Sequence, residues 1–444
     1  MRLWYKTDAS LVSRNMLLHG YVISEMRKRL PLLMLWVLLN GIALHAGEGP
    51  DQTLPVKERV SVASHIFADV QIFFGHWEGI PNFDLNGEYS AYLDKVLASS
   101  SRKAFDFATL ELMAKLRNGH SGFRDAWLQD TYGQQLNFYA YPVDGQWVVT
   151  RSELSDLKVG DVLAALNGEP FESFYRRCRP YISASDERWR KRALFEYPYL
   201  FPERFELTLD HGRSVTVHRQ GAFRSAGSEN TKIDVSNHER VLLIRIPGFH
   251  TANLEADAVE ALRNASSAKA VIIDVRGNHG GSTPQTLIAA LMDRLYRWFS
   301  ESTPARIGSF QLYGSMGTHT DLRWFGRIEE PTDVLYKGSL YLLTDGGCFS
   351  ACEDFVVGFK DNHRAAIIGE RTAGSSGQPY QHRFENGMVF GLSAKREFMP
   401  DGSPFEGVGI APDIEVDVHA ADVTSGRDPG LEKALSLAKS SGSR

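Results

Sequence analysis

The sequence predicts an α/β protein, and two observations in its second half lead to that class. Short apolar runs rich in Val, Ile and Leu recur there, as buried strands require. Apolar residues at helical spacing fill several of the gaps between these runs, which is the alternation expected of strands and helices packed in layers. The predicted strands are Arg240–Ile246, Ala270–Val275, Ser339–Leu343, Ala365–Ile368 and Val389–Ser393, and the predicted helices are Asn253–Ser266, Thr283–Trp298 and Ala351–Lys360.

The composition sets the size of the protein and excludes some functions. The chain has 444 residues, 43% of them hydrophobic and 23% charged, which is enough for two or three domains with separate cores. A net charge of −5 gives no basic surface for nucleic acid. The 14 histidines and 3 cysteines show no His-x-x-x-His or Cys-x-x-Cys spacing. We therefore expect no metal site and no cofactor.

The amino-terminal segment has the three parts of a secretory signal. The basic cluster Arg27–Arg29 precedes the apolar run Leu30–Leu39 and a stretch of small residues. We expect residues 1–46 to be a signal peptide or leader, with translation starting either at Met26 or, with an unusually long leader, at Met1. We expect the protein to be periplasmic or secreted. The alternative is a membrane anchor that is not cleaved. No other stretch is long enough to span a bilayer, which excludes a multi-span protein.

The first domain, residues 56–125, is predicted to be helical. Three apolar stripes at helical spacing, which begin at Val60, Tyr92 and Phe105, predict a bundle of three helices. The third helix runs into Leu-Arg-Asn-Gly-His-Ser-Gly, where Gly119 supplies a stop and places His120 in a turn. A lone histidine in a turn is usually only solvated, so these residues alone leave the role of His120 open.

Residues 131–222 are predicted to be rich in β-structure. The expected strands are Gln135–Tyr141, Trp147–Thr150, Asp161–Leu166, Phe205–Leu209 and Ser214–His218. An arginine-rich insertion, Tyr175–Tyr199, is expected to be a solvated helical excursion, with the lining of a substrate entrance as the alternative. The polar stretch Ala222–Asn237 predicts a linker. The last domain is placed at residues 238–440, and its final helix at Ala421–Arg444.

The stretch Leu342–Phe359 predicts a strand, a sharp turn and a helix. Asp345-Gly-Gly breaks the apolar run and places Ser350 at the helix start. A serine there is either a plain N-cap or a nucleophile whose oxyanion is held by the first free backbone N–H groups. Cys348 and Cys352 flank this serine, and we expect them to be small buried thiols that pack the turn.

Several segments together resemble one family. Ser350-Ala-Cys-Glu after a glycine-rich turn resembles the signature of the C-terminal processing (tail-specific) serine peptidases, and Asp274–Gly281, Ile368–Gly374 and Gly407–Asp413 resemble further motifs of that family in the same order. The sequence around His120 is similar to the branch that includes the tricorn core protease and interphotoreceptor retinoid-binding protein. The resemblance is strong over roughly the last two hundred residues.

This resemblance implies a fold for each part of the chain. The carboxyl-terminal domain should be a Clp protease/crotonase-like spiral ββα core, preceded by the helical bundle. The segment Leu157–Pro170 resembles a hairpin of PDZ-like domains, which bind extended peptide at a sheet edge.

The resemblance also implies a mechanism. Ser350 is the expected nucleophile, His120 the general base and acid, and Glu406 the group that orients the base through an intervening hydroxyl. The best-known branch of the family uses a lysine base instead, but Ser375 stands at the corresponding place, so a Ser/Lys dyad is not expected. The branch with a histidine base has the hydroxyl just before that histidine. Here Gly119 stands at that position, so Ser121 or Ser375 would have to supply it.

The expected donors for the oxyanion are backbone groups. The Ala351 N–H comes free at the helix start, and Gly280 or Gly281 allows the backbone to approach the substrate carbonyl. A simple turn is the alternative role for these two glycines. An ordinary histidine pKa near about 6.5 would let the base act at neutral pH.

The function expected from the sequence is that of a serine endopeptidase. It would hydrolyse extended or unfolded polypeptides by a Ser/His mechanism, with protein or peptide substrates as partners and a homo-oligomer as a compatible state. The alternative is a catalytically weak protein of the peptidase fold that binds peptide or an apolar ligand. The presence of Ser350, His120 and Glu406 weighs against this alternative.

Overall fold

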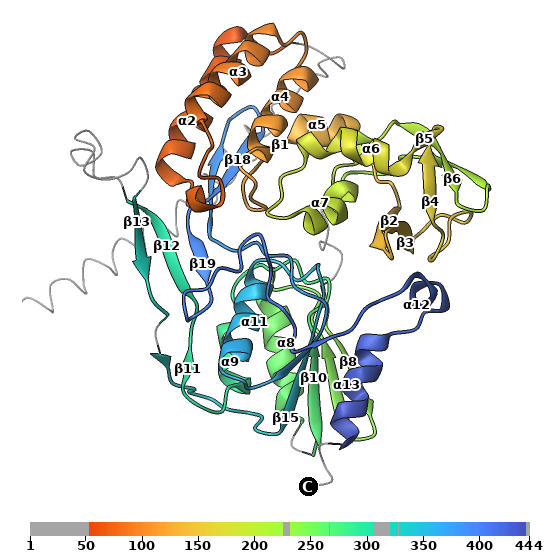
Figure 1. Cartoon of the computed structure of the whole chain (residues 1–444), viewed down its shortest axis with the longest axis vertical. Helices are drawn as coiled ribbons and strands as arrows, with labels where there is room; N and C mark the ends of the chain where they lie inside the picture. Colours follow the sequence, from red (N-terminus) through yellow and green to blue (C-terminus); the bar gives the residue numbers. More distant parts are fainter. Residues whose placement is uncertain (1–52, 225–230, 266, 306–319, 327, 441–444) are drawn as a thin grey trace, which may run out of the picture. The chain divides into compact units, whose positions relative to one another are not determined.

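A six-stranded sheet forms the centre of the carboxyl-terminal half of the chain (Figure 1). The computed structural model describes residues 53–224, 231–265, 267–305, 320–326 and 328–440, which belong to one unit. The strand order is β20-β16-β15-β10-β9-β8, and every pair is parallel except β8 with β9. The strands are β8 (Asp234–His238), β9 (Val241–Arg245), β10 (Ala270–Asp274), β15 (Ser339–Thr344), β16 (Ala366–Gly369) and β20 (Ile414–Glu415).

Helices cover both faces of this sheet, as a parallel sheet requires. Side chains alternate along each strand, so Ile273 and Leu342 pack on one face and Ile272 and Leu343 on the other. The first face is covered by α8 (Ala252–Arg263), α9 (Gln285–Leu291) and α11 (Ala351–Asp361), and the second by α13 (Pro429–Ser440). The predicted α/β class is confirmed.

Three elements of this half differ from the prediction. Helix α9 ends at Leu291 because the buried Arg364 guanidinium takes the Leu291 carbonyl, with Nε to O at 2.8 Å, and the next residue is extended. The single final helix is split into α12 (Ala420–Ser425) and α13, because Gly426 adopts a left-handed φ of 69°. The expected linker contains strand β8, a polar edge strand without the apolar alternation that would have predicted it.

The three helices predicted for the first domain are present as α2 (Val56–Phe73), α3 (Leu85–Ala98) and α4 (Arg102–Ala114). The chain then forms strand β1 (Gly122–Asp125), which pairs with β18 (Met388–Ser393), and β18 pairs with β17 (Pro379–Arg383). This pairing, which the sequence did not predict, joins the helical region to the carboxyl-terminal half. It fixes the turn between α4 and β1, where His120 lies.

The β-rich region contains the predicted strands, in two sheets. Strands β2 (Phe138–Val143) and β3 (Gln146–Ser152) form one, and the second has the order β5-β4-β6-β7. The strands of the second sheet are β4 (Leu163–Leu166), β5 (Glu169–Pro170), β6 (Arg204–Leu209) and β7 (Ser214–His218).

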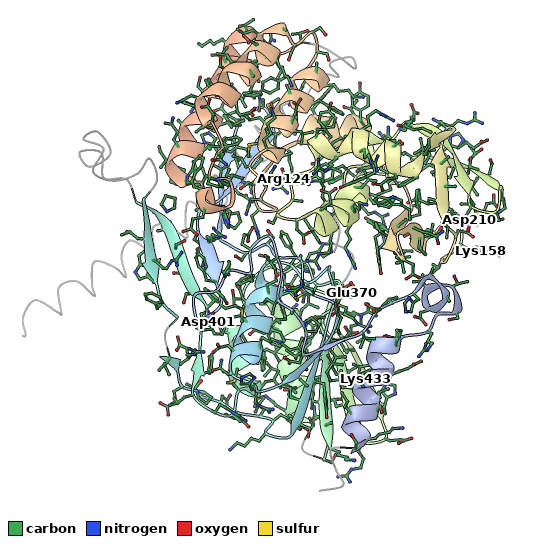
Figure 2. All side chains as sticks on the ribbon, in the orientation of Figure 1. Arg124, Lys158, Asp210, Glu370, Asp401 and Lys433 are labelled. Atoms are coloured by element: carbon green, nitrogen blue, oxygen red, sulfur yellow. A yellow bond between two sulfur atoms is a disulfide. The ribbon has the colours of Figure 1, made fainter. Side chains whose placement is uncertain are left out.

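The arginine-rich insertion carries helices α6 (Phe171–Cys178) and α7 (Glu187–Ala193). The expectation of a solvated excursion is wrong for α7. Trp189 is 6% exposed, and Arg188 donates to the carbonyls of Thr372 and Val408 at 3.2 and 3.0 Å. Arg192 donates to Glu370, which is labelled in Figure 2, at 2.9 Å. Helix α7 therefore fixes the β-rich region to the loops at the carboxyl end of the parallel sheet.

Candidate active site

Ser350 lies where β15 gives way to α11, in a tight turn held on two sides. The Ser350 N–H donates to the Ser375 carbonyl and the Phe349 N–H to the Asn278 carbonyl, both at 3.0 Å. Ser350 has φ 58° and ψ −126°, an unfavourable conformation for a residue with a Cβ that must be imposed by its surroundings. Its side chain makes no capping bond to α11. The Ser350 hydroxyl therefore does not serve as the N-cap of α11.

The Ser350 hydroxyl faces the imidazole of His120. The distance from Ser350 Oγ to His120 Nε2 is 2.8 Å, and the other ring nitrogen, Nδ1, lies 3.1 Å from Ser375 Oγ. The imidazole stacks on the Phe349 ring, with centroids 4.6 Å apart, and Phe349 stacks in the same way on Trp189. Hydrogen bonds at both nitrogens and a ring contact on one face thus fix the orientation of the imidazole.

The structure distinguishes between the two hydroxyls considered behind the histidine. Ser375 Oγ lies within hydrogen-bond distance of the imidazole nitrogen Nδ1 of His120. It also lies only 2.8 Å from the position that a Cβ on Gly119 would occupy. Ser121 is buried and points away, with its hydroxyl 3.0 Å from Asn118 Oδ1 and 3.1 Å from the Ser393 N–H. Ser375, and not Ser121, therefore takes the place that Gly119 leaves empty.

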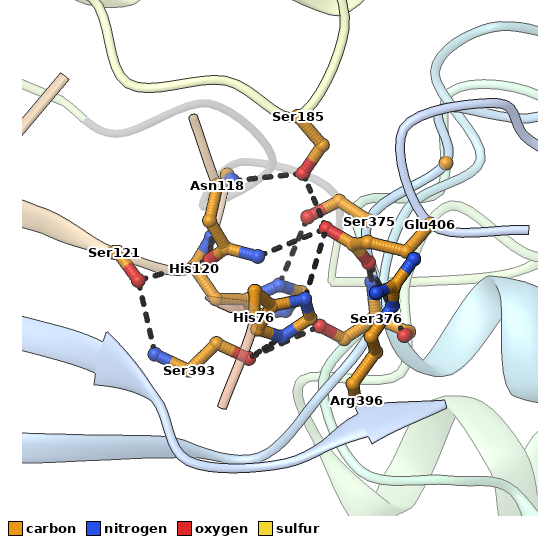
Figure 3. A network of polar contacts seen from close by, with 12 residues as sticks. His76, Asn118, His120, Ser121, Ser185, Ser375, Ser376, Ser393, Arg396 and Glu406 are labelled. Carbon is orange, nitrogen blue, oxygen red and sulfur yellow. Dashed lines mark hydrogen bonds and ion pairs between the residues drawn. The ribbon is translucent and has the colours of Figure 1, made fainter. Parts of the chain in front are cut away.

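Glu406 does not reach the imidazole through a hydroxyl as expected (Figure 3). Its Oε1 accepts from Ser185 Oγ at 2.6 Å and from Asn118 Nδ2 at 2.9 Å, and its Oε2 accepts from the Ser376 N–H at 2.7 Å. Asn118 Oδ1 in turn accepts from the His120 N–H at 2.9 Å. Glu406 thus holds the two turns that carry His120 and Ser375, and contacts the histidine only through Asn118.

A second buried carboxyl group supports the Ser375 turn. Glu353, in the first turn of α11, accepts from Thr372 Oγ1 at 2.6 Å and from the N–H groups of Gly374 and Ser375 at 2.8 and 2.7 Å. Burial raises the pKa of Glu353 to about 8 and that of Glu406 to about 7. Glu353 binds mainly backbone N–H groups, and Glu406 binds two side chains and one backbone N–H, so both groups hold the turns of the site together.

Two backbone N–H groups, one directly after Ser350 and one directly after Gly280, are candidates for binding a ligand. The Gly280 N–H is already bonded to Asn278 Oδ1 at 2.8 Å. The N–H groups of Gly281 and Ala351 have no acceptor among the residues that the structure describes. Gly280 has φ 85°, and a Cβ there would lie 2.7 Å from the Ser350 Cβ, so only glycine fits. Of the three predicted donors, Gly281 and Ala351 are thus free to bind an oxyanion.

Cys348 and Cys352 form a disulfide around Ser350, with Cα atoms 5.4 Å apart. The expectation of two separate thiols is wrong. The sequence separation of 4 places both cysteines on the turn at the helix start, which brings their side chains together. Cys178 is the free, buried cysteine.

Three residues that hold the site together were not predicted from the sequence: Asn118, Ser185 and Asn278. Asn118 directly precedes Gly119-His120, and its proximity to the histidine was the available signal. Ser185 lies in the insertion expected to be solvated, so no local pattern pointed to it. Among the described residues no cluster of His, Cys, Asp or Glu fits a metal ion, and no described helix is long and apolar enough to cross a bilayer. The apolar run Leu30–Leu39 lies outside the described residues.

A serine, a histidine and two free N–H groups are the parts that a serine hydrolase site requires. Residues 240–416 match the model of Peptidase family S41. The family recognised from the motifs is confirmed.

The curated relatives match the chain over less than half of its length. The chain is 28% identical over 199 residues to a carboxyl-terminal-processing protease of Synechocystis sp., which is 44% of this chain and 43% of that protein. It is 27% identical over 179 residues to a putative tricorn protease homolog 2 of Streptomyces coelicolor, which is 40% of this chain and 13% of that protein. The chain therefore spans less than half of the length of these relatives.

Solved structures extend the likeness of the fold beyond the matched region. The structure of mature CPAF complexed with lactacystin superimposes with a TM-score of 0.67 at 17% identity, covering 86% of this chain and 98% of that one. A photosystem II D1 C-terminal processing protease superimposes with a TM-score of 0.51 at 16% identity, over 82% of this chain and 94% of that one. At these identities the likeness concerns the fold.

Proposed function

We propose that this protein is a serine endopeptidase that hydrolyses extended or unfolded polypeptides by a Ser/His mechanism. The observation that carries the proposal is the 2.8 Å approach of Ser350 Oγ to His120 Nε2, beside two N–H groups without acceptors. A hydroxyl needs a base within hydrogen-bond reach and fixed donors for the oxyanion, and the His120 contact and the two unbonded N–H groups support this mechanism.

The proposed chemistry follows from these positions. Ser350 Oγ attacks the carbonyl carbon of the scissile peptide bond while His120 Nε2 takes the hydroxyl proton. The N–H groups of Ala351 and Gly281 bind the oxyanion, and His120 then gives the proton to the leaving amine. A water molecule, activated by the same nitrogen, hydrolyses the acyl-enzyme. Ser375 Oγ accepts from Nδ1–H, which keeps Nε2 free for the proton of Ser350.

A fluorophosphonate probe tests this function directly. We expect it to label Ser350, as located by peptide mapping, and the purified protein to release peptides from casein. A protein that is folded by circular dichroism yet neither labelled nor able to digest casein would contradict the proposal. Such a result would favour the alternative of a binding protein with the peptidase fold.

The acid limb of the activity profile is expected at low pH. Burial lowers the pKa of His120 to about 4, so the expected value near about 6.5 is wrong for this site. Because the neutral imidazole is the base, protonation of His120 itself removes activity only around pH 4, and any loss near pH 7 belongs to Glu406, whose pKa burial raises to about 7. The labelling rate of Ser350, measured across the acid range, checks this. Tryptophan fluorescence at each pH excludes acid unfolding, and a limb near about 6.5 that persists in Glu406→Gln would contradict the shift.

Glu406→Gln is expected to lower kcat with little change in KM. A glutamine amide cannot accept both from Asn118 and Ser185 and from the Ser376 N–H, so the His120 and Ser375 turns move apart. A displacement of about 1 Å costs roughly 100-fold in rate. Steady-state kinetics on a peptide substrate measures this effect, with the exposed Glu385→Gln as matched control. An unchanged kcat would remove Glu406 from the positioning of the base.

Two finer features of the fold belong to the same proposal. We propose that residues 131–222 are a PDZ-like module that receives extended peptide, and that the carboxyl-terminal half is the spiral ββα core of the family. The four-stranded antiparallel sheet with α6 beside it supports the first, and the parallel sheet with helices after β9 and β15 supports the second.

Export to an oxidising compartment is also part of the proposal. It is supported by the basic and apolar segments within residues 1–46 and by the buried Cys348–Cys352 disulfide, since disulfides persist mainly outside the cytosol. Amino-terminal sequencing of protein from a secretory host should find a start near Gly47. An intact leader in the membrane fraction would favour the anchor instead.

A further inference from the structure

We propose that the Cys348–Cys352 disulfide is a positioning element of the active site, so that its reduction switches catalysis off. This inference rests on the proposed peptidase function. The disulfide closes a loop whose three inner residues each supply a part of the site. Phe349 carries the ring on which His120 stacks, Ser350 carries the hydroxyl, and Ala351 carries a free N–H.

The loop that the disulfide closes is bonded to two different walls of the site. The Cys348 carbonyl accepts from the Ala373 N–H at 2.9 Å, in the segment that leads to Ser375. The Phe349 N–H donates to the Asn278 carbonyl at 3.0 Å, in the segment that leads to Gly281. The closed loop therefore bridges the segment behind the base and the segment of the oxyanion donors, and the nucleophile lies between them.

The conformation of Ser350 explains why such a constraint is needed. A φ of 58° is unfavourable for serine, so the turn relaxes unless its neighbours impose it. When the disulfide is broken, Cys348 is no longer tied to the first turn of α11. Relaxation of Ser350 toward negative φ would then turn its hydroxyl away from His120 and displace the Phe349 ring.

A general role in stability accounts poorly for a disulfide at this place. In the chain-entropy description, a disulfide restricts the unfolded chain more as the closed loop grows longer. The separation of 4 residues is therefore among the least effective for that purpose. The same short loop is the most effective for fixing the residues inside it.

The switching reaction is an ordinary thiol–disulfide exchange with a dithiol. One thiolate of the dithiol attacks a cysteine sulfur and breaks the bond between Cys348 and Cys352. The second thiolate then closes the disulfide of the reagent and releases the second cysteine as a thiol. Two electrons and two protons pass to the cysteines. Both cysteines have 0% exposure, so the loop must open before the attack, and reduction is slow in the closed enzyme.

The double variant Cys348→Ala/Cys352→Ala tests the proposal, with Cys178→Ala as matched control because that cysteine is buried but free. The readout is the rate at which a fluorophosphonate labels Ser350. We expect a fall of about 100-fold in the double variant and no change in the control. The acid limb of labelling should also move from about pH 4 toward the ordinary histidine value, because a displaced Phe349 ring lets water reach His120.

A purely structural disulfide would give a different result. It would lower the melting temperature but leave the labelling rate and the acid limb unchanged well below that temperature, and this outcome overturns the proposal. If the double variant does not fold, the wild type is reduced with dithiothreitol, checked by mass, and reoxidised. Loss and recovery of labelling are expected, and unchanged labelling of the reduced protein overturns the proposal. Absence of labelling in the oxidised wild type is instead the failure of the proposed peptidase function.

Discussion

Ser350→Ala is expected to abolish the hydrolysis of casein while the protein remains folded. The alanine removes the hydroxyl that lies 2.8 Å from His120 Nε2 and leaves the backbone turn in place. Loss of a triad serine costs about six orders of magnitude in kcat, because no other group forms the acyl-enzyme. Peptide release measured by mass spectrometry, with the fluorophosphonate label on the wild type as reference, provides the test.

The exposed serine variant Ser267→Ala is the matched control and should digest casein at the wild-type rate. Circular dichroism must show that Ser350→Ala keeps its secondary structure. A decrease of only about tenfold would mean that another residue is the nucleophile, because the oxyanion donors alone retain a far smaller fraction of the activity.

The sequence predicted the elements whose signal is local. The central strands are buried on both faces, so β10 and β15 appear as continuous apolar runs, and the glycine-rich turn after β15 marks the start of α11. Ser350 and His120 were found in this way, each from its own turn and motif. That they meet across 230 positions followed only from the family resemblance, because no local pattern reports such a distance.

Several of the features that were missed depend on contacts between distant segments. Strand β1 is short and polar and exists because β18 lies beside it. Helix α7 was expected to be solvated because its arginines are charged. Instead, Arg188 donates to a backbone carbonyl and Arg192 to a carboxylate of the carboxyl-terminal half. In both cases tertiary contacts override the local preference of the segment.

The hydroxyl that binds Nδ1 of His120 also depends on a contact between distant segments, which the sequence alone does not reveal. Gly119 supplies no hydroxyl directly before the histidine. Ser121 and Ser375 were equally acceptable in the sequence as the source of that hydroxyl. Ser375 takes this place because of a backbone hydrogen bond, in which the Ser350 N–H donates to the Ser375 carbonyl at 3.0 Å. This bond brings the Ser375 hydroxyl beside the imidazole. Likewise, Glu406 was identified from its motif, but its partners Asn118 and Ser185 come from two other regions of the chain.

His120→Ala is expected to be nearly as damaging as the loss of Ser350, with kcat lower by several orders of magnitude. The base and the nucleophile act as one unit, so the loss of either removes the same step. Neither Lys360 nor Lys395 is available in its place. Lys360 pairs with Asp413, and Lys395 lies 2.7 Å from Glu301 and 3.1 Å from Glu397. Burial would lower the pKa of Lys395, but these carboxylates raise it above its ordinary value, so this lysine stays charged.

The comparison of His120→Ala with Lys360→Ala, Lys395→Ala and the exposed His211→Ala decides which group is the base. Each variant is assayed for casein digestion and for the labelling rate of Ser350, after circular dichroism has shown that it is folded. The two lysine variants and His211→Ala should retain most of the wild-type rate, because none of these side chains touches Ser350 or His120. A folded lysine variant without turnover, beside an active His120→Ala, would assign the base to that lysine. The 2.8 Å contact between Ser350 and His120 would then have no catalytic role.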